Sequence, residues 1–515
     1  MVATLVSRIV GMLRDSIIAG QLGLTVQADA YTAAFRVPDL LYYLVAGGAI
    51  SSTFVPVFVE YIDNGNKRAA WKTFSVVATL IVIIGVFLIA LCEFNAFKLV
   101  HLLNPKSSME SLLLATKLTK VLLPAQIFFM LGGLLMGAQN AWGKYLNAAL
   151  APTIYNIGII FGALFLTHTR LGITGLVWGA VTGAFVGNFF LQLFPVMRLG
   201  MQFRPSLAVF HPGVVRVGKM MLPILLGASL PNVDQQINSY FASQLPGGSR
   251  AAIMYANRIM LIPIGIFAQA MGQAILPSLS SMANQRNFSD FRSTLNKGIR
   301  TIAFLTIPSS ALLYLLSVPL IGVLLHHAHF HQSDVVLVAR PLEMYTIGIF
   351  AWSAQAILTR CFYALQDSKT PVISGTILSV VFIGMNWIVV HGTHTGIAGL
   401  AFATSLAAMA HTAIMMIILH RRLKGLQNRK LIQSLLRTSI ATAALGVAVW
   451  LTCRILELFV PPSRSTLGSL LWVTVGGGVG LVTFIAVSAG LKAPEMSVVT
   501  SIAAKLRSRI SARKT

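Results

Sequence analysis

Apolar stretches of about 20 residues recur along almost the whole chain, and that length lets an α-helix cross a hydrocarbon core roughly 30 Å thick. Short charged or turn-rich segments separate these stretches. Of the 515 residues, 56% are hydrophobic and only 10% are charged, and the mean hydropathy is +0.77. This composition leaves too little polar surface to cover soluble domains of such size. The pattern therefore predicts an all-α polytopic membrane protein.

The apolar windows predict fourteen transmembrane helices, at residues 2–24, 28–58, 73–95, 112–138, 146–167, 171–197, 217–243, 251–281, 301–325, 335–364, 371–391, 396–419, 436–456 and 467–490. Lys and Arg are distributed unequally between alternate loops. Eighteen lie in the loops after the even-numbered spans and six more follow residue 491, against five in the opposite loops. Because cytoplasmic loops are enriched in Lys and Arg, we expect both termini in the cytoplasm.

The formal net charge of +25 raises the alternative of a nucleic-acid binder. The basic residues lie at the ends of the predicted helices, where the loop asymmetry accounts for them, so we expect no nucleic-acid partner. Three cysteines, Cys92, Cys361 and Cys453, are far apart in the sequence and lack neighbouring histidines that would complete a metal set. We expect them to be packing residues.

An internal repeat relates the two halves of the chain. Gly172-Ile-Thr-Gly-Leu-Val-Trp-Gly in the sixth span resembles Gly396-Ile-Ala-Gly-Leu-Ala-Phe-Ala in the twelfth, an offset of 224 residues, and three further landmarks recur at 221 to 227 residues. The repeat predicts two six-helix lobes of the same orientation around a central cavity. We expect an N-terminal lobe at 1–200, a C-terminal lobe at 210–425, two added helices at 430–491 and a basic tail at 492–515.

The basic tail has two interpretations. Its apolar residues fall on one helical face, which predicts an amphipathic helix on the anionic inner leaflet. The alternative is a frayed basic end that serves only to fix the topology.

Charged residues inside the predicted spans are candidates for the functional site. At the centre of a membrane helix each costs at least about 2.5 to 3.5 kcal/mol, so each predicts a partner or a wet cavity. Arginine stays charged at any depth and binds phosphate through two parallel hydrogen bonds, so a diphosphate is the expected guest. The predicted substrate-binding residues are Arg8, Arg14, Asp29, Arg36 and Arg258. Arg8 shares a helical face with Asp15, and Asp29 shares one with Arg36, so the alternative is ion pairs that only join helices.

A second, weaker candidate is a cation site. Asp234 supplies a carboxylate, and Asn386 and Thr404 supply neutral oxygens, a set that could enclose a small cation or position a proton. The alternative is ordinary polar contacts between packed helices.

Four histidines crowd one outward loop: His326, His327, His329 and His331. No acid or cysteine completes a fixed metal site, so a solvated turn is the preferred interpretation and metal binding the alternative.

An enzyme is disfavoured by the inventory of acids. Only fourteen Asp and Glu residues exist, and Glu60 and Asp63 are the only two within four residues of each other. They adjoin Lys67 and Arg68 at a predicted helix end. No GxSxG or Walker loop is present, and no extramembrane domain is left to hold such chemistry. We therefore expect a transporter without a cofactor.

Several sequence motifs, taken in combination, are typical of one family. In the first lobe they are Ser7-Arg-Ile-Val-Gly-Met-Leu-Arg-Asp15, Ala28-Asp-Ala-Tyr, Arg36-Val-Pro-Asp-Leu-Leu, Ala46-Gly-Gly-Ala-Ile-Ser-Ser and Phe54-Val-Pro-Val-Phe. In the second they are Tyr255-Ala-Asn-Arg258, Ile262-Pro-Ile-Gly and Phe362-Tyr-Ala-Leu-Gln-Asp-Ser-Lys-Thr-Pro371. These motifs resemble those of the MurJ (MviN) lipid II flippases of the multidrug/oligosaccharidyl-lipid/polysaccharide exporter superfamily, and the resemblance covers nearly the whole chain.

The resemblance implies two six-helix lobes plus two C-terminal helices in the bacterial inner membrane. The implied substrate is lipid II, the undecaprenyl-diphosphate-linked peptidoglycan precursor, moved outward for cell-wall biosynthesis. Arg8, Arg14 and Arg258 match family arginines implicated in function, and Asp29 matches an acid of the same kind. Lipid II and membrane lipids are the implied partners, and other cell-wall synthesis proteins are further candidates.

The chain departs from the family pattern in places. Tyr42 and Tyr43 stand where many members have a pair of arginines, Gly47 replaces a common glutamate, and Leu261 occupies a position that is acidic in some members. Those roles do not carry over, and we expect Arg36 to supply part of the missing charge. Since the first motif begins at Ser7, we also expect the natural start several residues upstream. No removable signal is expected, because the first apolar stretch is charged.

The resulting hypothesis is alternating access driven by the membrane potential, with Na⁺ or H⁺ as candidate coupling ions. One rival is a flippase for another lipid-linked oligosaccharide. A second is a cation-coupled multidrug exporter of the same superfamily, although such a cavity would favour acids over arginines. A scaffold with a degenerate cavity is the third.

Overall fold

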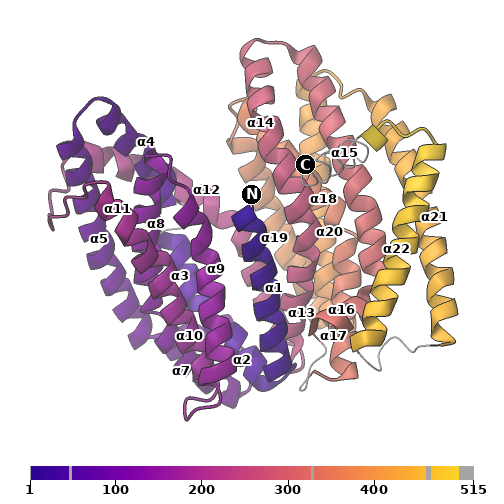
Figure 1. Cartoon of the computed structure of the whole chain (residues 1–515), viewed down its shortest axis with the longest axis horizontal. Coiled ribbons are helices and arrows are strands. Elements are labelled where there is room, and N and C mark those ends of the chain that lie inside the picture. The colour runs from indigo at the N-terminus through magenta and orange to yellow at the C-terminus, as the bar shows by residue number, and fades with distance from the viewer. Residues whose placement is uncertain (1, 46–48, 326–329, 460–465, 498–515) are drawn as a thin grey trace, which may run out of the picture. The chain divides into compact units, whose positions relative to one another are not determined.

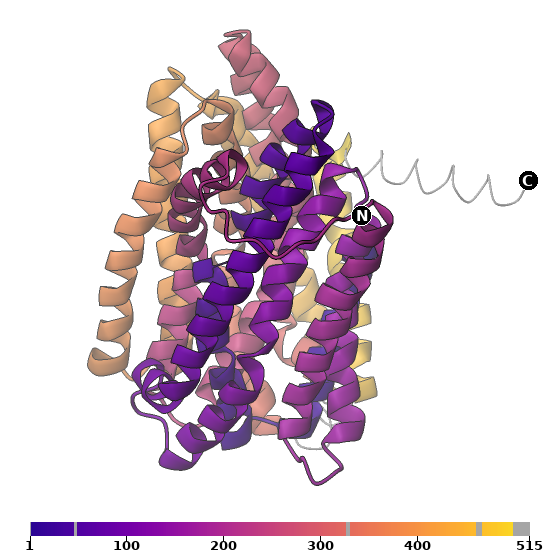
Figure 2. The same cartoon turned by 90° about the vertical axis from the view of Figure 1, so that its left-hand side faces the viewer.

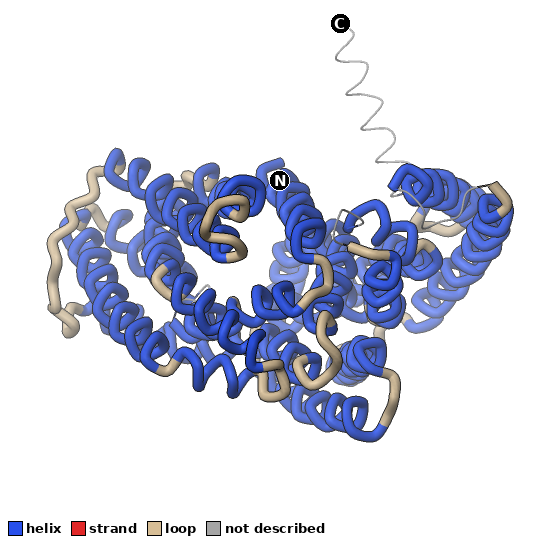
Figure 3. The backbone as a smooth tube through the Cα atoms, turned by 90° about the horizontal axis from the view of Figure 1, so that it is seen from below, coloured by secondary structure: helices blue, strands red, loops and turns tan. Residues whose placement is uncertain are grey.

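The computed structural model describes residues 2–45, 49–325, 330–459 and 466–497 (Figure 1). Within these ranges every regular element is a helix and no strand occurs, as the tube in Figure 3 shows. The predicted all-α class is confirmed. Contacts divide the chain into two compact units, the first running to Ala251 and the second beginning at Ala252.

The first unit contains α1 (Val2–Leu22), α2 (Val26–Ala34), α3 (Arg36–Val45), α4 (Ala49–Asp63), α5 (Lys67–Phe94), α6 (Ala96–Leu103), α7 (Met109–Leu122), α8 (Ala125–Ala141), α9 (Leu146–Phe161), η1 (Gly162–Leu166), α10 (Thr174–Ala184), η2 (Phe185–Phe190), α11 (Leu191–Arg198) and α12 (Pro212–Ala242). The segments η1 and η2 are π-helical turns inserted into longer helices. The start of α13 (Ser249–Pro263) also belongs to this unit.

The second unit continues from α13 through η3 (Ile264–Ala268), α14 (Gln269–Asn284), α15 (Phe288–Leu315), α16 (Ser317–Leu325), α17 (Gln332–Thr346), α18 (Ile349–Ala364), α19 (Lys369–Gly392), α20 (Gly396–Arg422), α21 (Asn428–Glu457) and α22 (Thr466–Gly490). Within it α21 packs against α15 and α22.

Where the structure describes them, all fourteen predicted spans coincide with helices or with consecutive helical segments. Among the residues described, nine helices are long and apolar enough to cross a membrane, or up to eleven if two bent pairs, α7 with α8 and α17 with α18, each form one span. The three predicted spans outside this count are α1, the broken run α2 to α4, and α12. Of these, α1 carries three charged residues. Two of these charges, Arg8 and Arg14, are candidate site residues, whereas the candidate Arg258 lies in a helix within the count.

The predicted repeat is visible in the order and length of the helices. α5 and α15 both have 28 residues, with an offset of 221 between their first residues, 67 and 288. Offsets of 223 and 222 relate the starts of α9 and α19, at 146 and 369, and of α10 and α20, at 174 and 396. In the compact units, however, α12 packs against α3, α4 and α5. The four domain boundaries drawn from the sequence stay a prediction.

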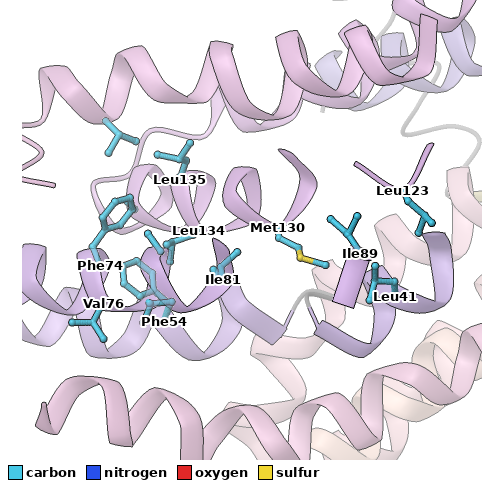
Figure 4. Close-up of a cluster of buried hydrophobic side chains, with 14 of the residues drawn as sticks. Leu41, Phe54, Phe74, Val76, Ile81, Ile89, Leu123, Met130, Leu134 and Leu135 are labelled. Carbon is cyan, nitrogen blue, oxygen red and sulfur yellow. The ribbon is translucent and has the colours of Figure 1, made fainter. Parts of the chain in front are cut away.

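A buried aromatic cluster fixes the start of α5 against α4. Phe58 lies 4.8 Å from Phe54 and 5.1 Å from Trp71, measured between ring centroids, and Trp71 lies 5.5 Å from Phe74. These rings belong to a larger apolar core that continues along α5 and α8, part of which is shown in Figure 4. Buried aromatic pairs add about 0.5–1.5 kcal/mol each beyond their area, so this end of the unit is held firmly.

The helices α9 and α10 cross without side chains between them. A Cβ atom added to Gly158 would lie 2.6 Å from the Cα of Gly183, and one added to Gly162 would lie 2.6 Å from the carbonyl oxygen of Gly175. Small residues allow such close approach in membrane helices. This crossing sets the position of α9, which carries the partner of Arg14.

Candidate functional site

Arg14 is held within the first unit between α1 and α9. Its Nε and Nη2 donate to Oδ1 of Asp15 at 3.0 and 2.7 Å, and its Nη1 donates to Oδ1 of Asn156 at 2.7 Å. The two charged side chains are only 15% and 13% exposed. Two of the bonds reach one carboxylate oxygen, so Asp15 occupies the phosphate-binding edge of the guanidinium.

This pairing differs from what helical spacing predicts. Residues i and i+1 do not face each other on a helix, and shared faces were therefore expected at longer spacings, such as Arg8 with Asp15. The long arginine side chain bends back to the next residue instead. Arg8 itself is exposed on α1. Arg14 thus lies beside a neutralising acid, and Arg8 presents its charge outward.

Asp29 caps the start of α13. Its Oδ2 accepts a hydrogen bond from the Gly248 amide at 2.7 Å, and its Oδ1 accepts one from the Ala251 amide at 3.1 Å. Free amides and the positive end of the helix dipole favour a carboxylate at this place. Gly248 has φ +84°, and a Cβ there would lie 2.7 Å from the Leu24 carbonyl oxygen, so only glycine fits. Both oxygens of the predicted site residue are engaged in a helix contact.

Arg250 is the residue that the sequence analysis missed, because it was counted as a loop cation. It is 1% exposed. Its Nη1 donates to the carbonyl oxygen of Asp29 at 3.1 Å and its Nη2 donates to the Ser107 hydroxyl at 2.8 Å. It therefore joins α2, the loop before α7 and the start of α13. The only available signal was its position directly after Gly247-Gly248-Ser249, a turn that can direct the next side chain inward.

Arg36 begins α3 and is half-buried. Its charge interacts with that of Arg250. Two arginines therefore lie near the buried α2–α13 contact. Tyr42, which stands where many family members have an arginine, packs on Phe129 with ring centroids 6.0 Å apart. The side chain of Tyr43, and Gly47, lie outside the described part of the chain.

Arg258 lies on α13 in the second unit and is half-buried. The preceding residue, Asn257, interacts with the buried Tyr345 hydroxyl, and so does Thr404. Thr404 also donates to the Leu400 carbonyl oxygen at 2.7 Å. The structure therefore places Thr404 in a polar cluster with Tyr345 and Asn257.

The predicted cation set is divided between the two units. Asn386 is fully buried in α19 and Thr404 lies in α20, both in the second unit, whereas Asp234 lies on α12 in the first. Within the part of the chain that the structure covers, no three His, Cys, Asp or Glu side chains are grouped to hold a metal. Of the histidine cluster, His331 is exposed and the other three lie outside the described residues. The cation site stays a prediction.

The first residues of the C-terminal tail pack against the second unit. Glu495 is 5% exposed, accepts from Arg300 Nε at 2.7 Å and accepts from the Ser434 hydroxyl at 2.9 Å. These contacts tie the segment after α22 to α15 and α21. Residues 498–515, for which an amphipathic helix is predicted, lie outside the described residues.

Comparison with known proteins identifies the family. The family model "Lipid II flippase MurJ" matches residues 18–466. A Vibrio cholerae protein named probable lipid II flippase MurJ is 32% identical over 462 residues, covering 87% of each chain. A Burkholderia cenocepacia protein named lipid II flippase MurJ is 30% identical over 428 residues, covering 81% of this chain and 82% of its own.

Solved structures agree with that assignment. A lipid II flippase MurJ in an inward closed conformation superposes with a TM-score of 0.79 at 26% identity, covering 95% of this chain and 97% of its own. An inward-facing multidrug resistance transporter of the MATE family gives a TM-score of 0.69 at 16% identity, covering 82% and 96%, which shows a shared fold only. Since the family match spans most of the sequence, the chain belongs to the MurJ family of lipid II flippases, multi-pass transporters of the bacterial inner membrane rather than enzymes.

Proposed function

We propose that this chain moves lipid II from the inner to the outer leaflet of the bacterial cytoplasmic membrane by alternating access, with both termini in the cytoplasm. Membership of the family supports the substrate. The observation that carries the mechanism is the Arg14 guanidinium, held in a nearly buried pair with Asp15 on α1, a helix that carries three charged residues.

In this mechanism Asp15 binds the Arg14 guanidinium whenever the substrate diphosphate is absent. A guanidinium has five N–H groups, and Arg14 uses three of them on Asp15 and Asn156. A diphosphate oxygen can take over the edge held by Asp15, because it offers the same geometry with more charge. The acid then returns when the headgroup leaves. Arg14 is thereby never left as an uncompensated charge in a low dielectric medium.

The exposed Arg8 and the half-buried Arg258 are the proposed further contacts to the diphosphate. Outward movement of one net negative charge is favoured by about 2.3 kcal/mol per 100 mV of an inside-negative potential. We therefore propose the membrane potential as one driving force, with Na⁺ or H⁺ as a candidate partner ion.

Depletion of the protein in its host tests the proposal. We expect lipid II to accumulate in the inner leaflet and the cells to lose shape and lyse. Complementation with wild type should restore outer-leaflet lipid II, whereas Arg14→Ala should not. The control is Arg454→Gln, which removes an arginine from an exposed ion pair on α21 and should also restore it. Normal outer-leaflet lipid II during depletion would refute the function, and rescue by Arg14→Ala would refute the capture step alone.

A further inference from the structure

The first unit has a second cationic site, away from the Arg14 pair. A cavity of about 740 Å³ lies between the N-terminal turns of α5 and the linker that joins α11 to α12, residues 199–211. Among the residues that the structure describes, its charged and titratable lining residues are Arg68, Lys72, Arg204 and His211, with no acid. By the loop-charge asymmetry this end of α5 faces the cytoplasm.

The linker is held on α5 by hydroxyl groups rather than by secondary structure. The Ser75 hydroxyl donates to the Gln202 carbonyl oxygen at 3.2 Å and accepts from the Arg204 amide at 3.1 Å, and the Thr79 hydroxyl accepts from the Ser206 amide at 3.2 Å. Figure 2 shows the linker as a coil that crosses the face of this unit. Arg204 is therefore fixed by its own backbone at the wall of the cavity.

The electrostatic field in the cavity is positive. The Thr73 hydroxyl lies 3.4 Å from Nδ1 of His211. Burial, and then the charge of Lys72, lower the pKa of His211 below its ordinary value. Both effects favour the neutral imidazole, and among the described lining residues the three permanent cations have no counter-charge. An anion supplied from outside would relieve their mutual repulsion.

Exposed apolar side chains of the linker indicate where that anion comes from. Leu207 is 64% exposed and Phe210 is 89% exposed, and Phe203 beside Arg204 is 46% exposed. Ser206 of the linker bonds to Thr79, which lies about 18 Å along α5 from Lys67, the first residue of that helix, since a helix rises 1.5 Å per residue. Apolar residues flanking cations at this depth are typical of a segment that lies in the lipid interface.

We propose that this cavity binds the phosphate of an anionic phospholipid headgroup of the inner leaflet, while the linker inserts Phe203, Leu207 and Phe210 among the acyl chains. Phosphate is the shared chemistry of a lipid headgroup and a free anion, and the apolar rim favours the lipid. None of the predicted lipid II residues lines the cavity, and the proposal does not depend on transport.

Thermal unfolding of the purified full chain in detergent tests the site. We expect added phosphatidylglycerol to raise Tm by several degrees and phosphatidylcholine to have little effect. The variants Arg204→Gln and Lys72→Gln should lose most of that increase, while Lys219→Gln, an exposed cation on α12 outside the lining, should keep it. Each variant's Tm without lipid shows whether it folds.

Two further arms distinguish the source of the phosphate. Inorganic phosphate at matched concentration should not reproduce the increase, and Leu207→Gln with Phe210→Gln should weaken the response to phosphatidylglycerol. An equal response to inorganic phosphate would overturn the lipid assignment. An unchanged phosphatidylglycerol response in both cation variants, or no response in wild type, would overturn the site.

Discussion

Arg250 donates to the main-chain carbonyl of Asp29 at 3.1 Å, while the carboxylate of Asp29 caps the helix on which Arg250 lies. Each residue thus stabilises the backbone of the other's segment. The two are 221 residues apart in sequence, so the contact closes a long section of the first unit upon itself.

Arg250→Gln should destabilise the protein although it lies outside the predicted substrate site. The substitution removes two hydrogen bonds from a fully buried guanidinium, a loss of about 1–3 kcal/mol. Thermal unfolding in detergent measures it. Arg170→Gln, at an exposed cation in the turn before α10, is the matched control and should leave Tm unchanged. Equal Tm values for the two variants would show that the buried bonds contribute nothing.

Asp29→Ala should cost more stability than Asp29→Asn. Alanine offers no acceptor to the amides of Gly248 and Ala251, and loss of a cap costs about 0.5–2 kcal/mol. Asparagine keeps one acceptor but loses the charge that favours the helix end. Unfolding measured for both variants, with amide hydrogen exchange at residues 248–251, tests the order. If these amides exchanged no faster in either variant than in wild type, the result would argue against capping by Asp29.

Asp15→Asn should increase retention of lipid II and slow its release. The asparagine of the variant pairs less strongly with Arg14 than the carboxylate of Asp15 does. The diphosphate therefore displaces it more easily on binding and is displaced less easily on release. Binding of labelled lipid II to purified protein, and its flipping in proteoliposomes, measure the two effects. Arg14→Lys should weaken binding, because an ammonium cannot form the bidentate contact. Tighter binding without slower flipping would contradict the exchange mechanism.

Asp367→Asn should destabilise the second unit at neutral pH and have a smaller effect in acid. Asp367 accepts bonds from the Thr370 amide and hydroxyl and pairs with Arg422 at 2.6 Å. Burial would raise the pKa of Asp367, but these bonds and the charge of Arg422 outweigh it and hold the pKa below its ordinary value.

The sign of the pH dependence follows from that direction. A carboxyl with a lowered folded pKa contributes stability above its unfolded pKa of about 3.9, and the contribution disappears as pH falls through the folded value. The difference in Tm between wild type and Asp367→Asn should therefore be largest at pH 6–7 and shrink below about pH 4. A difference that grows in acid would contradict this assignment.

Gly158→Ala should disrupt the first unit. The added Cβ would lie 2.6 Å from the Cα of Gly183, so α9 and α10 must separate. Overpacking of this kind costs about 1–3 kcal/mol, and it would also displace Asn156 from Arg14. Gly478→Ala on α22, where a Cβ meets nothing within 4 Å, is the control. Expression and Tm of the two variants measure the difference.

Hydropathy and loop charge were sufficient to predict the helices, because insertion in lipid imposes these patterns. The repeat could be anticipated for another reason, since sequence motifs recur at nearly one offset. The inward turn of Arg250 could not, since it depends on a glycine at positive φ and a partner 221 residues away. The pairing of Arg14 with its neighbour was missed for a different reason. Helical periodicity describes where Cβ atoms point, and a long guanidinium can depart from it.

The Asp29 cap at Gly248 and Ala251 has a consequence for how α2 and α13 can separate. Because the cap is made by one side chain and two amides, no turn of helix has to unwind for the contact to open. Water can satisfy both amides and both oxygens as soon as they separate. The contact between α2 and α13 is therefore stable while water is excluded, and it can open reversibly at little cost in free energy once water reaches it.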